Sequence, residues 1–280
     1  MLTNENASIL SQSETLTDKH VLRISLSMMI LIVIVISGMF LISSSNDVDF
    51  ECKNLPPSLN AIFGYDWLGR NVFIRTITGL SISIICACVS SILSTILSIV
   101  FGYIQSSSNK AISAFASSLC DLICGIPQIV LLLLISISLN RGYLGVIVGI
   151  SVTHWASLSK ILCGEIKEIK QTSWYMFATK NYSYLKRMSL LLPCLLPQII
   201  VGAGLMFPHA ILHESTITFL GFGLSAETPA VGIILSEASA HLANGIWWVA
   251  ILPGLALILV TLLTKYTAEL LSNLISQGKH

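Results

Sequence analysis

The sequence predicts an all-α, polytopic membrane protein with six transmembrane helices. Of its 280 residues, 54% are hydrophobic and only 10% are charged, and the mean hydropathy is +0.82. Soluble domains carry roughly 25% charged residues, so this composition excludes a soluble fold. The net charge of +1 gives no indication of nucleic-acid binding. The apolar residues also gather into runs of the length that a helix needs to cross a bilayer, which is about 20 residues.

Six apolar runs meet this length. Their approximate bounds are Val21–Ile42, Ser81–Ile104, Ala114–Leu139, Leu144–Leu162, Leu191–Leu212 and Trp247–Leu271. Ser, Gly and Ala are frequent within them, which suits close packing of helices in lipid. A further apolar segment, Phe219–Asn244, is broken by glycines and by Pro229. We therefore expect an external re-entrant or interfacial hairpin there rather than a seventh span.

The distribution of Lys and Arg sets the expected orientation, because cytoplasmic loops carry an excess of both. With six spans, most basic residues fall on the side of the amino terminus, and only four fall opposite: Lys53, Arg70, Arg75 and Arg141. Both termini are therefore expected in the cytoplasm. The expected organisation is a flexible cytoplasmic tail (1–20), a six-span domain (21–272) and a second tail (273–280). The six-span domain includes an external loop (44–73), a cytoplasmic loop (163–190) and an external re-entrant segment (219–246).

The cytoplasmic loop at 163–190 is the longest polar and basic segment inside the chain. Apolar residues at helical spacing, among them Trp174, Phe177 and Ala178, predict a helix–turn–helix at the membrane surface. Two interpretations follow from these features alone. The loop could rest on lipid headgroups, or it could present a docking surface to a cytoplasmic partner.

The same loop resembles the EAA loop of bacterial ABC importer permeases, in which a short coupling helix docks on the ATPase subunit. The resemblance lies in Tyr175, Ala178, Thr179 and the Leu196-Pro197 pair. It departs from the family pattern at Thr179, where a second Ala is usual, and at Ser183, which holds the usual Gly position. The resemblance implies that the residues coupling the chain to the ATPase are Glu165, Tyr175, Ala178, Thr179 and Ser183.

Two further motifs resemble the dipeptide, oligopeptide and nickel permease group. Residues 64–73 read G-Y-D-W-L-G-R-N-V-F, similar to G-T-D-x-L-G-R-D-V-F, and residues 219–224 read F-L-G-F-G-L, similar to S-F-L-G-L-G. Within this group the chain resembles the second permease subunit, the one with the shorter external region after its first span. The resemblance implies a type I importer permease fold and half of a translocation pore in the bacterial cytoplasmic membrane. The implied partners are a homologous second permease, two ATPase subunits and an extracytoplasmic substrate-binding protein.

The chain is expected to be a transporter subunit rather than an enzyme. It lacks the G-x-x-x-x-G-K-[ST] pattern that holds ATP phosphates. ATP and Mg²⁺ would therefore bind to the ATPase subunits, and no cofactor is expected on this chain.

Ionisable side chains inside spans are costly and mark candidate functional sites. The candidates for a translocation pathway are His154, His209, His213, Glu214 and Asp121. His209 and His213 are four residues apart and share a helical face, and imidazole suits nickel, cobalt, zinc and copper. They could bind a metal transiently. The alternative is that these side chains form hydrogen bonds to neighbouring helices and have a structural role.

The histidine-rich segment looks more like the nickel and metal–metallophore branch, so the expected cargo is nickel, cobalt, zinc or a metal–metallophore complex. A di- or oligopeptide is the alternative. Two other classes receive little support. The sequence H-E-S-T-I at His213 begins like the zinc-protease motif H-E-x-x-H, but Ile217 replaces the second ligand. A stand-alone secondary transporter would show inverted repeats and paired broken helices, and neither is visible.

Overall fold

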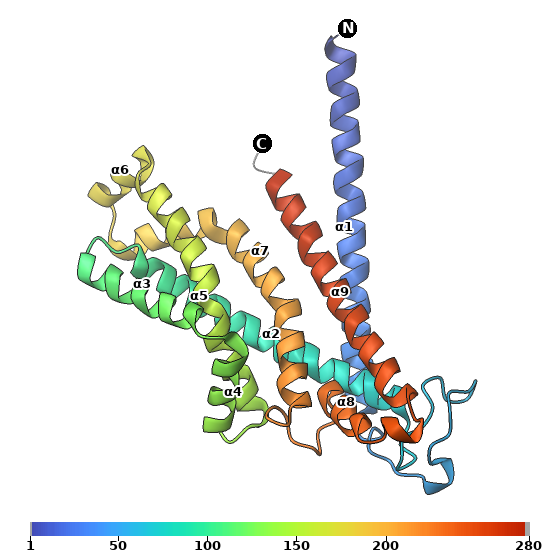
Figure 1. Ribbon diagram of the computed structural model, residues 1–280. Coiled ribbons are helices and arrows are strands. Elements are labelled where there is room, and N and C mark those ends of the chain that lie inside the picture. The colour runs from blue at the N-terminus through green and yellow to red at the C-terminus, as the bar shows by residue number, and fades with distance from the viewer. Residues whose placement is uncertain (1, 278–280) are drawn as a thin grey trace.

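The computed structural model describes residues 2–277, with side chains described for 19–275 except 184 and 185. This part of the chain is helical and contains no strand beyond two isolated bridges, which confirms the all-α prediction (Figure 1). The elements are α1 (Leu2–Leu41), η1 (Phe50–Cys52), α2 (Val72–Gln105), α3 (Lys110–Gly125), α4 (Gln128–Ser138), α5 (Gly142–Lys170), α6 (Ser173–Asn181), α7 (Tyr184–Phe219), α8 (Val231–Ser239), η2 (Leu242–Asn244) and α9 (Trp248–Gln277).

Five described helices are long and apolar enough to cross a membrane. They are α2, α5 and the segments Lys19–Leu41 of α1, Lys186–Phe219 of α7 and Trp248–Ile275 of α9. A sixth span is present if α3 and α4 are counted together, although they are bent by 98° relative to each other. The prediction of a continuous third span over Ala114–Leu139 is therefore wrong. Proline disfavours helical backbone in the residue before it, and Ile126, which precedes Pro127, is extended at φ −85° and ψ 135°.

The chain ends differ from the expected tails. Helix α1 begins at Leu2, whereas residues 1–20 were expected to be flexible. Residues 2–20 contain neither Gly nor Pro, so nothing in their backbone prevents them from extending the helix that the apolar span forms. At the other end α9 continues to Gln277, and residues 278–280 of the predicted tail lie outside the described residues.

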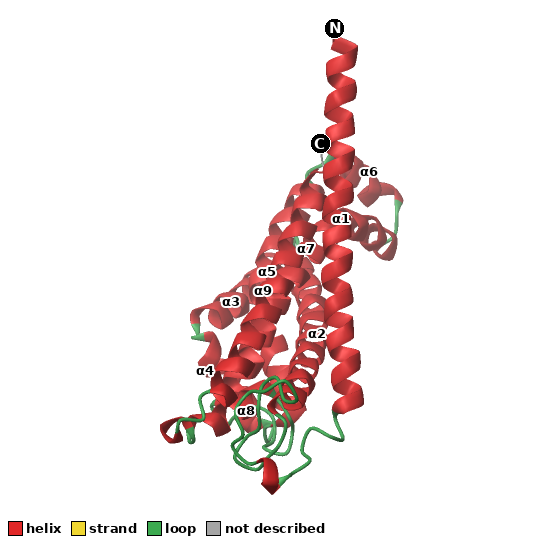
Figure 2. Cartoon of the chain, turned by 90° about the vertical axis from the view of Figure 1, so that its right-hand side faces the viewer, coloured by secondary structure: helices red, strands yellow, loops and turns green. Residues whose placement is uncertain are grey.

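Helix α2 lies at the centre of the bundle, in contact with α1, α5 and α7. Figure 2 shows it alongside α1. Its seam with α5 is made of small residues that allow close approach. Ser98 Oγ donates to the Trp155 carbonyl at 2.9 Å, and Gln105 Nε2 donates to Ser159 Oγ at 2.9 Å. A Cβ at Gly102 would lie 3.0 Å from the Ser159 carbonyl oxygen. The close α2–α5 contact therefore depends on small side chains.

The two ends of the bundle carry different structures. Helix α6 lies at the same end as the two ends of the described chain, and α8 lies at the other end with the loop that follows α1 (Figure 1). Residues 220–247 contain a turn, α8 and η2, and none of these elements is long enough to cross a membrane. This agrees with the absence of a seventh span over Phe219–Asn244.

Replacing Gly69 with Ala is expected to destabilise the loop that precedes α2. Gly69 has φ +77°, and an added Cβ would clash with the Asp49 carbonyl oxygen. Gly142→Ala is the matched control, because Gly142 has a similar φ of +76° but no atom near the added Cβ. The left-handed backbone costs about 1–2 kcal/mol in both variants. Thermal unfolding of the purified protein should show a larger loss for Gly69→Ala, and equal losses would contradict the importance of this contact.

Candidate functional site

A buried ionic network joins the loop before α2 to α8. Asp66 Oδ2 accepts from Arg70 Nε at 2.6 Å and from Arg75 Nη1 at 2.9 Å, and its Oδ1 accepts the backbone N–H groups of Leu68 and Arg70. Glu237 Oε2 on α8 accepts from both guanidinium groups at 3.0 Å. We call these four residues, Asp66, Arg70, Arg75 and Glu237, the Asp66–Glu237 network. The ion pair between Asp66 and Arg70 uses the four-residue spacing of Asp and Arg in the G-Y-D-W-L-G-R-N segment.

Aromatic contacts extend the same structure. The Trp67 ring stacks on His241 with centroids 4.2 Å apart, and the Arg70 guanidinium lies 5.2 Å from the Trp67 ring centre. Trp248 at the start of α9 donates from Nε1 to the Tyr65 carbonyl at 3.1 Å. In the same loop, the Cys52 thiol donates to the Asp49 carboxylate, which raises the pKa of the thiol. The loop is thus held to α2, α8 and α9.

At the other end of the bundle, helix α6 forms the middle of the predicted cytoplasmic loop. It follows Thr172, which has an extended backbone, and ends before Tyr182. Tyr175 and Ala178 are buried, with 5% and 2% of their surfaces exposed. Trp174 and Phe177 are much more exposed, at 43% and 62%. Helix α6 therefore buries Tyr175 and Ala178 against the chain and leaves two large aromatic side chains exposed.

The five predicted coupling residues divide into two groups. Thr179 and Ser183 are exposed, and Glu165 near the end of α5 is partly exposed. Tyr175 and Ala178 face their own chain, so the structure does not place them on the outer surface where the sequence predicted docking. Trp174 and Phe177 are exposed instead. In the sequence they were identified only as part of one apolar stripe.

A cation fixes the end of α5 immediately before α6. Lys170 Nζ donates to the backbone carbonyl of Ser106 at 2.6 Å and to its Oγ at 3.0 Å. The ammonium also lies 5.1 Å from the centre of the Tyr103 ring. These contacts join α5 to the end of α2. The base of α6 is thereby attached to two spans of the bundle.

The predicted pathway residues do not form one cluster. Asp121 on α3 pairs with Lys160 on α5 at 2.7 Å, and both side chains are exposed. His209 is exposed, whereas His213 is partly buried and its ring centre lies 5.0 Å from that of His154. In the part of the chain whose side chains are described, no three His, Cys, Asp or Glu residues are grouped as metal ligands. The His209–His213 metal site therefore gains no third protein ligand from them.

Glu214 is fully buried and saturated with hydrogen bonds. Its Oε2 accepts from Ser83 Oγ on α2 and from Ser215 Oγ at 3.2 Å, and its Oε1 accepts from Thr218 Oγ1 at 2.9 Å. Thr218 Oγ1 in turn accepts the Leu224 N–H at 3.2 Å. These bonds connect α7, α2 and the turn after α7. Hydrogen bonds of this kind are expected if Glu214 has a structural role rather than a place on a translocation pathway.

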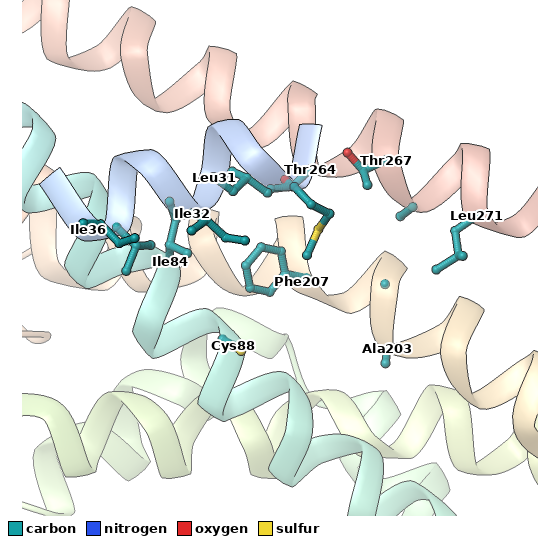
Figure 3. A pocket seen from close by; sticks show the side chains of 14 residues that line it. Leu31, Ile32, Ile36, Ile84, Cys88, Ala203, Phe207, Thr264, Thr267 and Leu271 are labelled. Atoms are coloured by element: carbon teal, nitrogen blue, oxygen red, sulfur yellow. The ribbon is translucent and has the colours of Figure 1, made fainter. Parts of the chain in front are cut away.

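A separate cavity of about 450 Å³ lies among α1, α2, α7 and α9. Figure 3 shows that its lining side chains include Leu31 and Ile36 of α1, Ile84 of α2 and Phe207 of α7. The lining contains no His, acid or base. The surface of this cavity suits hydrocarbon and offers no partner to a charged cargo.

The fold and these sites define a helical membrane permease with a surface helix at one end and a tightly held loop at the other. The chain belongs to the family of binding-protein-dependent transport system inner membrane components, whose profile matches residues 94–277. It is thus a permease of an ABC importer family and a transporter rather than an enzyme. Members of this family work with a partner permease, an ATPase and a binding protein in the inner membrane.

Similar proteins carry peptide-permease names. The chain is 28% identical over 206 residues to the dipeptide transport system permease protein DppC of Bacillus subtilis, covering 72% of this chain and 64% of that one. It is 29% identical over 227 residues to a putative peptide permease of Brucella ovis, covering 80% and 75%. It is 24% identical over 226 residues to the oligopeptide transport system permease protein OppC of B. subtilis, covering 78% and 74%.

A solved structure has the same fold. It is the crystal structure of an amino acid ABC transporter with histidines, with a TM-score of 0.55 and 15% sequence identity. The match covers 71% of this chain and 93% of the other. The expected ABC importer permease fold is therefore confirmed.

Proposed function

We propose that this chain is one permease subunit of an ATP-driven importer of di- or oligopeptides. The observation that carries the proposal is that its relatives from Bacillus and Brucella are named as peptide permeases. The expected nickel or metal–metallophore cargo has no comparable support. The peptide alternative therefore becomes the preferred function.

The structure suggests how such a subunit would connect to its partners. The outward face of α6, formed by Trp174 and Phe177, is a suitable surface for an ATPase subunit because large aromatic side chains dominate protein–protein contacts. The basic residues Lys167, Lys180 and Lys186 of the same loop are also exposed. Their positive charge supports a cytoplasmic location for α6 and both termini. The Asp66–Glu237 network, at the opposite end of the bundle, would then lie on the side of the binding protein.

Loss of this subunit is expected to abolish uptake of labelled di- and oligopeptides in its native cells. Uptake of labelled nickel, cobalt and zinc is expected to remain unchanged, because peptide import is the proposed role. The measurement compares cells with and without the subunit, and re-expression of the same chain is the control. Loss of metal uptake with normal peptide uptake would reverse the assignment.

A further inference from the structure

We infer that His154 and His213 form a binding site for a divalent transition-metal ion such as Zn²⁺ between α5 and α7. The two side chains come from different spans, and their ring centres are 5.0 Å apart with planes inclined at 72°. Two imidazoles that bind one tetrahedral cation through bonds of about 2.0–2.1 Å hold their ring centres roughly 5 Å apart. The separation between the two ring centres is therefore compatible with a shared ion.

The hydrogen bonding of His154 prepares one of its nitrogens for a metal. Its Nδ1 lies 2.9 Å from the Ile150 carbonyl oxygen. A carbonyl only accepts hydrogen bonds. The Thr153 hydroxyl, 3.0 Å from Nδ1, already donates to the same carbonyl, so Nδ1 carries the proton and Nε2 of the neutral imidazole has the free lone pair. Histidines that bind metals commonly donate their other N–H to a backbone carbonyl, which fixes the ring. His154 has this arrangement.

The free nitrogen of His154 is buried without a partner. Only 8% of the residue is exposed, and Nε2 makes no hydrogen bond in the structure. Buried polar atoms normally have a partner, and leaving one unpaired is costly. A cation held between Nε2 and the His213 ring would satisfy it. His213 is itself partly exposed.

The site differs in ligands and in role from the His209–His213 pair considered above. His209 is exposed on α7, whereas the His154 ring lies against His213. With two protein ligands and the remaining positions filled by water, the site would be open and exchangeable, unlike a closed structural zinc site. A bound ion would link α5 to α7. It would act as a reversible restraint on two spans rather than as cargo.

Zinc binding to the purified importer complex in lipid nanodiscs tests this inference without any transport step. The complex is first stripped of metal by a chelator and then titrated with radiolabelled Zn²⁺. His213→Ala and His154→Gln are each expected to weaken one zinc site per copy of this chain by at least tenfold, because even losses outside the ligands cost about 10–100-fold. His209→Ala is the matched control and should bind zinc like the unaltered complex.

Equal zinc binding by the unaltered complex and the His213→Ala variant would overturn the site. This variant remains informative if His154→Gln fails to assemble, since the His213 side chain is less buried. In proteoliposomes, zinc should stay on the protein and not accumulate inside, and ATP-driven accumulation would overturn its role as a restraint. Zinc is also expected to inhibit peptide uptake by the unaltered complex, and to inhibit it less in His213→Ala. This uptake experiment rests on the proposed function, whereas the binding titration does not depend on it.

Discussion

Replacing Phe177 with Asp is expected to uncouple the permease from its ATPase and to abolish peptide import. Phe177 is the most exposed aromatic side chain on α6, and nothing within the described chain covers its outer face. Aromatic residues at the centre of an interface typically contribute about 2 kcal/mol or more, which corresponds to roughly 30-fold in affinity. A carboxylate at the same position would have to be desolvated against an apolar surface, which adds to the loss.

Co-purification of the ATPase subunit with tagged permease measures this effect, alongside peptide uptake. Phe177→Leu is the control, because it keeps an apolar side chain and should retain most of both signals. Ala178→Asp is unsuited to this purpose, since Ala178 is buried against its own chain and its replacement would disturb α6 itself. Normal ATPase binding and uptake in Phe177→Asp would show that this face of α6 is not the docking surface.

Replacing Asp66 with Asn is expected to cause the largest loss of stability outside the membrane helices. Asp66 is fully buried and pairs with the guanidinium groups of Arg70 and Arg75. The Arg75 side chain is only 1% exposed. Removing one partner from a buried ion pair costs about 3–5 kcal/mol, because the remaining charge is left uncompensated. Glu237 still contacts both arginines in the variant. Two cations would then share one carboxylate instead of two.

The thermal unfolding midpoint of the purified protein and its abundance in the membrane both report this loss. Asp121→Asn is the matched control, because it also removes a carboxylate from an ion pair but on an exposed surface. Such pairs contribute about 0–1 kcal/mol. Similar effects of the two substitutions would contradict the importance of the Asp66–Glu237 network.

The membrane spans could be predicted from the sequence because hydropathy depends on local composition. Five runs match single helices, although the boundaries differ by several residues. The bend at Pro127 was visible as a proline inside an apolar run, but composition alone does not distinguish a bent pair from one span. Helix α7 illustrates this, because it contains Pro193, Pro197 and Pro208 and still continues as one helix from Tyr184 to Phe219.

The sites were less predictable because they depend on contacts between distant segments. Arg75 and Glu237 are 162 residues apart, so no local pattern links them. The spacing of His209 and His213 suggested a pair on one helix, whereas the structure places His213 against His154 on another. The motifs correctly indicated the importer family, but the histidines led the sequence interpretation toward metal cargo.

Peptide accumulation by purified components tests the proposed role most directly. Proteoliposomes would contain this chain, its partner permease and the ATPase subunits, with the binding protein and labelled dipeptide outside and ATP inside. We expect accumulation that requires ATP and disappears when this chain is omitted or carries Phe177→Asp. Uptake that proceeds without ATP, or through this chain alone, would contradict its assignment as an ATPase-coupled importer subunit.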